Sequence, residues 1–67
     1  MNEEDFKNIK SITIIGTEDH YGFTMSKWEF IPKKESGEMA SIRWIEVWRD
    51  DVKIAYLPMR ACIINFI

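Results

Sequence analysis

The segment IRWIEVWRDDVKIAY, residues 42–56, constrains the fold more than any other part of this chain. Two runs of alternating side chains flank a short polar break at Asp50–Asp51, and this pattern predicts a β-hairpin with a tight turn. The first run is apolar on both faces of the strand. The two faces carry, respectively, Ile42, Trp44 and Trp48, and Ile45 and Val47. A strand in a small monomer should bury one face only, so the second face requires a cover.

The length of the chain limits how that cover can be supplied. Residues 1–67 form a single domain at most, and a chain this short buries only about 60% of its unfolded surface. Its single cysteine, Cys62, excludes an internal disulfide, and one His with one Cys does not make a usual tetrahedral metal site. No cofactor signature is present. An efficient core or self-association must therefore provide stability, and nine aromatic residues (three Trp, four Phe, two Tyr) suit both.

Charge and hydropathy argue against nucleic acid and membranes as partners. The formal net charge of −2 argues against a general nucleic-acid binder, which normally carries a basic patch or stripe. The acidic, polar segment MNEEDFKNIK does not resemble a signal peptide. No apolar run approaches the roughly 20 residues of a membrane span. The expectation is a cytoplasmic protein without a membrane partner.

The pattern of side chains predicts a mainly β chain with a short N-terminal helix. The helix is expected to begin at an Asn2 cap and to carry Phe6 and Ile9 on one side. Five strands are expected, at residues 11–18, 22–32, 38–51, 52–58 and 61–67. A loop with Gly37 at its turn separates the second and third, and Leu57–Arg60 interrupts the alternation between the last two.

The second expected strand changes phase along its length. Phe23 and Met25 lie on odd positions, whereas Trp28 and Phe30 lie on even ones. Side chains alternate strictly along a strand, so this segment needs a bulge or a sharp bend near Ser26–Lys27. A long bent strand lets a small barrel pass from one sheet to the other. The sequence therefore predicts a small, five-stranded, strongly bent antiparallel barrel.

This order of elements resembles the Sm-like or SH3-like small β-barrel. The segment IAYLPMRACIINFI is similar to the strand, one-turn break and final strand of Sm-like proteins, and ITIIGTEDHYGFTMSKWEF is similar to the first hairpin of such barrels. The resemblance covers almost the whole chain as a pattern of apolar positions. It implies association through edge strands and, in the RNA-binding members, a Tyr-Lys-His type of run in the last turn, where this chain has LPMR.

Aromatic and arginine side chains are the strongest candidates for a functional surface. The aromatic ones lie on adjacent strands if the second, third and fourth expected strands pair in order, and the arginines are interleaved with them. The predicted binding residues are Trp28, Trp44, Trp48, Tyr56, Arg43 and Arg60. Such residues dominate interface hot spots and stack on bases. The alternative is that this aromatic area serves the core and an oligomer contact, which is the commoner use in small domains.

Reactive groups have simpler explanations than catalysis. His20 beside Asp19 and Glu18 has the composition of a hairpin turn. Cys62 lies in an apolar strand, where a thiol is expected to be buried and inert. The neighbouring carboxylates of Asp50–Asp51 diverge at a strand end, as in a turn. No enzyme activity is predicted.

Two classes of function follow from these observations. The first is a small non-enzymatic binding protein, a homo-oligomer with Trp44 or Trp48 at a contact, that occupies a host protein or a small nucleotide-like ligand. Compact, acidic, aromatic-rich domains of this length resemble phage and mobile-element accessory proteins, including inhibitors of host defence. The alternative is an Sm-like oligomeric nucleic-acid binder. Its phosphate contacts would be Lys27, Lys33, Lys34, Arg43 and Arg60.

Overall fold

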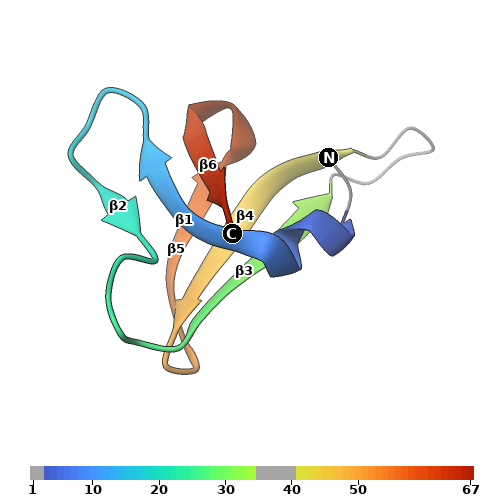
Figure 1. Ribbon diagram of the computed structural model, residues 1–67. Helices are drawn as coiled ribbons and strands as arrows, with labels where there is room; N and C mark the ends of the chain where they lie inside the picture. The colour runs from blue at the N-terminus through green and yellow to red at the C-terminus, as the bar shows by residue number, and fades with distance from the viewer. Residues whose placement is uncertain (1–2, 35–40) are drawn as a thin grey trace.

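The computed structural model describes residues 3–34 and 41–67, which form two small antiparallel sheets. The elements run in the order η1 (Glu3–Asn8), β1 (Ile9–Ile14), β2 (His20–Tyr21), β3 (Trp28–Lys34), β4 (Ile42–Arg49), β5 (Val52–Pro58), η2 (Met59–Ala61) and β6 (Cys62–Phe66). One sheet has the order β2-β1-β6 and the other the order β3-β4-β5, as Figure 1 shows. Both η segments are 3-10 helices. The Asn2 cap and the Gly37 turn lie outside the described residues.

The prediction of a mainly β chain with a short N-terminal helix is confirmed. The described residues form two three-stranded sheets that do not close, in place of one five-stranded barrel. The difference arises in the expected strand at residues 22–32, which is not one bent strand. Strand β2 ends at Tyr21 and β3 begins only at Trp28, so the phase change at Ser26–Lys27 marks a break between strands.

Gly22 allows the chain to make this break close to β1. Its φ of +94° lies in the region that L side chains rarely adopt. A Cβ atom at this position would lie 2.5 Å from the backbone oxygen of Lys10 and 3.0 Å from Cα of Ser11. The backbone of residue 22 therefore passes directly against β1, and only glycine fits there.

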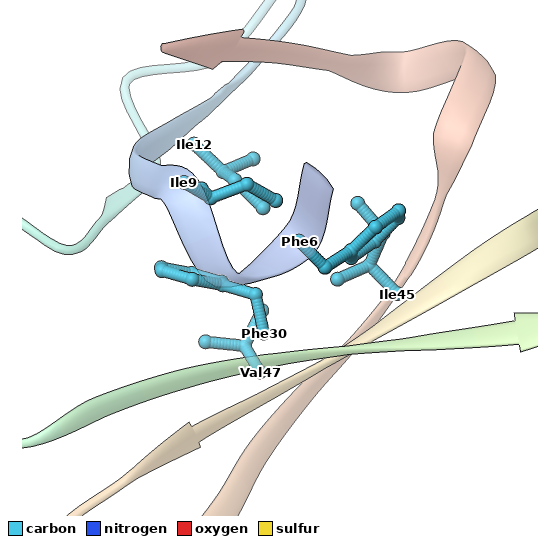
Figure 2. Close-up of a cluster of buried hydrophobic side chains, with 6 residues drawn as sticks. All are labelled: Phe6, Ile9, Ile12, Phe30, Ile45 and Val47. Atoms are coloured by element: carbon cyan, nitrogen blue, oxygen red, sulfur yellow. The ribbon is translucent and has the colours of Figure 1, made fainter. Parts of the chain in front are cut away.

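The core lies between the inner faces of the two sheets. Its buried side chains are Phe6 from η1, Ile9 and Ile12 from β1, Phe30 from β3, and Ile45 and Val47 from β4. Figure 2 shows these six side chains pointing toward one another between the layers. Phe6 and Ile9 are both buried, as expected, although Ile9 belongs to β1 and not to the helix. The buried hydroxyl of Ser11 accepts a hydrogen bond of 3.2 Å from Nδ2 of Asn65.

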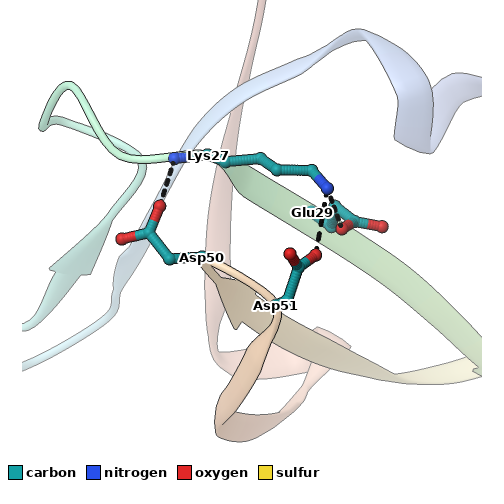
Figure 3. A network of polar contacts seen from close by, with 4 residues as sticks. All are labelled: Lys27, Glu29, Asp50 and Asp51. Atoms are coloured by element: carbon teal, nitrogen blue, oxygen red, sulfur yellow. Dashed lines mark hydrogen bonds and ion pairs between the residues drawn. The ribbon is translucent and has the colours of Figure 1, made fainter.

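The turn at Asp50–Asp51 is confirmed and is fastened to the start of β3. Both residues have positive φ values, 50° and 65°, as in the two-residue turns that match the twist of a hairpin. The backbone N–H of Lys27 donates to Oδ1 of Asp50 at 2.9 Å, and the N–H of Asp50 donates to the carbonyl oxygen of Lys27 at 2.8 Å. Figure 3 also shows Nζ of Lys27 paired with Asp51 at 2.9 Å and with Glu29 at 3.7 Å. These contacts hold the turn between β4 and β5 against the start of β3.

Replacement of Asp50 by alanine should destabilise this turn by about 1–2 kcal/mol, because it removes the acceptor for the Lys27 N–H and because alanine tolerates positive φ less well than aspartate does. Asparagine keeps a side-chain acceptor and tolerates positive φ. We therefore expect D50N to retain most of the wild-type free energy of unfolding in urea titrations. Equal losses in D50A and D50N would show that the Lys27 contact does not stabilise the turn.

The two ends of the described chain meet in the β2-β1-β6 sheet. Strand β6 pairs with β1 from Ile9–Phe66 to Ile14–Cys62, with a register shift near Lys10. The N–H of Ile67 donates to the carbonyl oxygen of Asn8 at 2.8 Å. The short helix η2 carries the chain from β5 in one sheet to β6 in the other, as the interruption at Leu57–Arg60 predicted.

Candidate functional site

Strand β4 places its two apolar faces in different surroundings. Ile45 and Val47 are 0% exposed and point into the core, so theirs is the face of the strand that the described chain buries. Trp44, Glu46 and Trp48 lie on the opposite side, which we call the outer face of the β3-β4-β5 sheet. Trp44 is 37% exposed there. The cover for this outer face is thus only partly supplied by the described chain.

The carboxylate of Glu46 lies on the outer face and contacts three side chains. Nε1–H of Trp48 donates to Oε1 of Glu46 at 3.0 Å. Nζ of Lys53 lies 3.3 Å and Nζ of Lys33 3.6 Å from Oε2, and the Glu46 side chain is only 13% exposed. The hydrogen bond that Trp48 donates is the largest cause that lowers the pKa of Glu46, followed by the hydrogen bond from Lys53 and the positive charges of Lys33 and Lys53. Trp48 is therefore held in place by a carboxylate on its own strand.

Protonation of Glu46 at acid pH should lower the free energy of unfolding. Because the pKa of its carboxyl group is lowered in the folded chain, the carboxylate contributes stability that is fully present above its ordinary value of 4.5 and is lost as the pH falls through the lower folded value. At neutral pH we expect E46Q to be less stable than the wild type, and the difference should shrink below about pH 4. Urea titrations from pH 7 to pH 3 measure this. A difference that stays constant over that range would contradict it.

Trp44 and Tyr56 form the most open part of the outer face. Their ring centroids are 5.0 Å apart with an interplanar angle of 79°, an edge-to-face pair across β4 and β5. Tyr56 is 50% exposed, and Nζ of Lys53 lies 5.1 Å from the centroid of its ring. The pairing of adjacent strands thus brings these two predicted binding residues together.

Arg43 and Arg60 adjoin the same aromatic pair. They line a groove between the start of β4 and η2, formed by Ser41–Trp44 and Pro58–Arg60. Both arginines are exposed. Trp44 also lines this groove, and Tyr56 packs edge-on against Trp44. We call these four residues together (Arg43, Trp44, Tyr56 and Arg60) the Trp44 surface.

Trp28 lies elsewhere and does not join this surface. It stacks on Phe30, with ring centroids 6.2 Å apart and an interplanar angle of 6°, and meets Tyr21 edge-on at 6.4 Å. The guanidinium of Arg49 lies 5.8 Å from its ring centroid. Trp28 shares the inward parity of Phe30, so it packs against the core. The predicted order of the three strands is confirmed, but Trp28 lies on the opposite face of the sheet from Trp44.

Glu46 and Lys53 were missed as components of the candidate site, and Lys33 was expected only as a phosphate contact. The position of Glu46, two residues from each tryptophan on the same strand, placed it on the same face by simple alternation. That signal was available in the sequence. The approach of Lys33 and Lys53 depends on two pairings, Lys33↔Trp44 in the regular part of the β3–β4 ladder and Trp48↔Lys53 after the register shift at Val47–Trp48.

The candidate reactive groups occupy structural positions. Nδ1 of His20 lies 2.9 Å from the carbonyl oxygen of Glu18, and its ring meets Phe23 edge-on at 4.9 Å. Asp50 and Asp51 belong to the hairpin turn. Within residues 3–34 and 41–67, no three His, Cys, Asp or Glu side chains gather as a metal ion would require.

Cys62 is half-buried, which corrects the expectation that it is fully buried. Its Sγ–H donates to the carbonyl oxygen of Pro58 at 3.3 Å, and burial raises its pKa. A raised pKa lowers the fraction of reactive thiolate at neutral pH. We expect an aromatic disulfide reagent at pH 7.5 to label native Cys62 much more slowly than the urea-unfolded chain. Equal rates in the two states would refute an inert thiol.

No helix in the part of the chain that the structure describes is long and apolar enough to cross a membrane. No protein-family model, no curated protein and no solved structure matches this chain.

Proposed function

We propose that this chain is a small non-enzymatic binding protein that self-associates and acts by occupying a host protein or a small nucleotide-like ligand through the Trp44 surface. The observation that carries this proposal is the exposed edge-to-face pair of Trp44 and Tyr56 beside two exposed arginines. Tryptophan, tyrosine and arginine contribute most of the energy at protein interfaces. An accessory protein from a phage or mobile element, blocking host defence, is the setting that we propose for such an activity.

Self-association is supported by the apolar area that stays open near the edge of the β3-β4-β5 sheet. Within the described chain, β5 pairs with β4 alone, and Val52, Ile54 and Tyr56 along it are all exposed. An uncovered edge strand of this composition favours pairing with another chain. A two-fold dimer is the commonest closed assembly, and a ring of the Sm-like type is the second possibility. We propose in addition that the fold is of the Sm-like or SH3-like type.

Solution mass and partner capture test the proposal together. Light scattering of the wild type at high micromolar concentration should report more than the 8.0 kDa of one chain. A W44S/Y56S variant should lose a partner that the wild type retains from host lysate. F23S removes an exposed aromatic side chain outside the Trp44 surface and is the matched control. Retention of the same partners by W44S/Y56S and by the wild type would show that this surface does not bind them.

An Sm-like nucleic-acid binder is the second candidate, favoured by the placement of Arg43 and Arg60 on either side of a groove with Trp44. The remaining proposed phosphate contacts are less available. Lys27 pairs with Asp51, Lys33 with Glu46, and Lys34 with Glu3 at 2.9 Å. Affinity for an oligonucleotide that falls steeply with salt concentration would favour this candidate over a protein partner.

A further inference from the structure

Strand β6 forms an open edge of the β2-β1-β6 sheet. Among the described residues it pairs with β1 alone, in an antiparallel ladder. At one end of this ladder the carbonyl oxygen of Ala61 accepts a hydrogen bond of 2.8 Å from the N–H of Ile15, and at the other end the N–H of Ile67 donates toward the same side at 2.8 Å. Backbone groups alternate in direction along a strand, so the odd-numbered residues of β6 face β1. The N–H and C=O groups of Ile64 and Phe66 therefore point away from the sheet.

These outward groups have no backbone partner in the described chain. The ladder with β1 uses the other side of the strand, and no turn or loop bonds to the backbone of Ile64 or Phe66. The N–H of Cys62 is already used, because it donates to the carbonyl oxygen of Met59 in η2. The fully open part of the edge therefore consists of Ile64 and Phe66.

The four edge strands of the two sheets differ in how they are protected against other chains. Lysine, proline, irregular pairing and short length all discourage an edge strand from pairing. Strand β3 has Pro32 followed by two lysines, and β5 has Lys53, Pro58 and a register shift against β4. Strand β2 is only two residues long. Strand β6 continues into Ile67 as CIINFI, without a charge or a proline, so its edge lacks this protection.

Apolar side chains on both faces of β6 are exposed beside this edge. Ile63 and Ile67 lie on the face away from the core and are 51% and 89% exposed, whereas Phe66 on the core side is 49% exposed. A strand without charges covers such side chains without burying an unpaired charge. Strand β6 is itself such a strand, so a second copy of the chain supplies a matching cover.

Building on the proposed self-association, we infer that two copies join through β6, antiparallel about a two-fold axis at Asn65. The outward N–H and C=O groups of Ile64 then exchange hydrogen bonds with those of the partner's Phe66, and the two sheets become one continuous sheet. A two-fold contact uses the same edge on both copies, so the assembly closes at two chains.

The side chains select this register. With Asn65 on the axis, Ile64 lies across from the partner's Phe66 on the core side, and Ile63 lies across from the partner's Ile67 on the other face. Apolar pairs directly across two strands stabilise a sheet. Moving the axis to Ile64 places Ile63 across from the partner's Asn65 and divides both apolar pairs. The edge of β6 is thus self-complementary in one register.

The inferred dimer is weak and leaves the Trp44 surface free. A contact of one strand per copy is smaller than the about 800 Å² per partner of a standard interface. The dimer should therefore form at high micromolar concentration and dissociate on dilution. None of its contact residues belongs to the Trp44 surface, so the dimer presents that surface twice.

Disulfide trapping tests the register in the full chain. The variant is N65C in a C62A background, which removes the native thiol. Facing residues that do not exchange hydrogen bonds have Cα atoms about 4.5 Å apart, a separation that a disulfide spans. Mild oxidation at high micromolar concentration should therefore convert most of N65C to a linked dimer. I63C and V52C, at exposed positions of β6 and β5 in the same background, are the matched controls and should stay mostly monomeric. Faster linking of either control than of N65C would overturn the inference.

Lysine substitution tests the same edge without a cross-link. In N65K two ammonium groups face each other across the axis, so the dissociation constant of the dimer should rise about fivefold or more. V52K adds the same charge to an exposed residue of β5 and should leave that constant unchanged. Sedimentation velocity over a dilution series measures both, and far-ultraviolet circular dichroism at low concentration shows whether each variant is folded. Equal effects of N65K and V52K would contradict the inference.

Other outcomes separate this inference from the proposed function. If V52K dissociates the wild-type assembly and N65K does not, β5 forms the contact, so the inference is wrong while the proposed self-association stands. If N65K leaves the mass unchanged but loses a partner that the wild type retains from host lysate, β6 binds a strand of another protein and the inference is also wrong. If the wild type is an 8.0 kDa monomer at high micromolar concentration, the inference and the proposed self-association both fail.

Discussion

Replacement of Gly22 by alanine should cost at least about 3 kcal/mol of folding free energy, which can unfold a domain of this size. Two penalties combine at this residue. Its φ of +94° disfavours any L side chain, and the new Cβ would lie 2.5 Å from the backbone oxygen of Lys10. Strand β1 cannot retreat easily because it pairs with β6 on its other side. Circular dichroism during thermal unfolding measures the loss.

Gly16 provides the matched control for this prediction. Its φ of +81° is similarly unfavourable, but a Cβ there would have no atom within 4 Å. G16A should therefore show the conformational penalty alone, roughly 1–2 kcal/mol. The difference between G22A and G16A isolates the contact with β1. If the two variants lose the same stability, the close passage of residue 22 along β1 is not a constraint on the fold.

Truncation of Ile45 to alanine is the second change with a large expected effect. Ile45 is 0% exposed and lies at the centre of the core, where removal of three methyl or methylene carbons leaves a cavity. Such changes cost about 2–5 kcal/mol, which is a large part of the roughly 3–10 kcal/mol available to a chain of this length. Guanidinium titrations should show I45A partly or wholly unfolded in dilute buffer.

Ile15 offers the same chemical change at the surface. It is 57% exposed in the turn just after β1, so I15A should lose less than about 1 kcal/mol. A loss in I15A as large as that in I45A would mean that apolar area on the surface, covered by another copy, contributes as much as the core. Repeating both titrations at two protein concentrations distinguishes these cases, because only self-association makes stability depend on concentration.

The last third of the fold could be predicted from the sequence because its signals are local. Alternation sets the strands on both sides of Asp50–Asp51, and the polar pair between them has the composition of a tight turn. The interruption at Leu57–Arg60 likewise marks η2 without reference to the rest of the chain. Strands β5 and β6 and the helix η2 lie within one or two residues of their expected places, and β4 ends two residues before the expected end at 51. Its expected start at residue 38 lies outside the described residues, and β4 begins at Ile42.

The break between β2 and β3 could not be predicted, because it depends on a contact between distant segments. The phase change at Ser26–Lys27 is visible in the sequence, and a bulge explains it as well as a break does. Only the passage of Gly22 against Lys10 on β1 decides between them. Sheet closure is decided by the same kind of long-range packing.

The candidate site was predictable to the extent that neighbours on paired strands determine it. Trp44 and Tyr56 meet because β4 and β5 form a hairpin. The face on which Trp28 lies could not be predicted, because alternation assigns a residue to one of two faces without saying which face is inside. That choice follows from Phe30, which packs into the core and takes Trp28 with it.

The pairing of β1 with β6 determines when the protein can finish folding. The β3-β4-β5 meander joins segments that are close in sequence, so it can form early. Ser11 and Asn65, which are hydrogen-bonded, are 54 residues apart, and closing so long a loop is entropically costly and slow. During synthesis on the ribosome, β1 can therefore pair with β6 only after almost all of β6 has emerged. Until then Ile9 and Ile12 lack their partners on that strand. The unpaired edge of β1 stays accessible to chaperones and proteases until β6 has emerged.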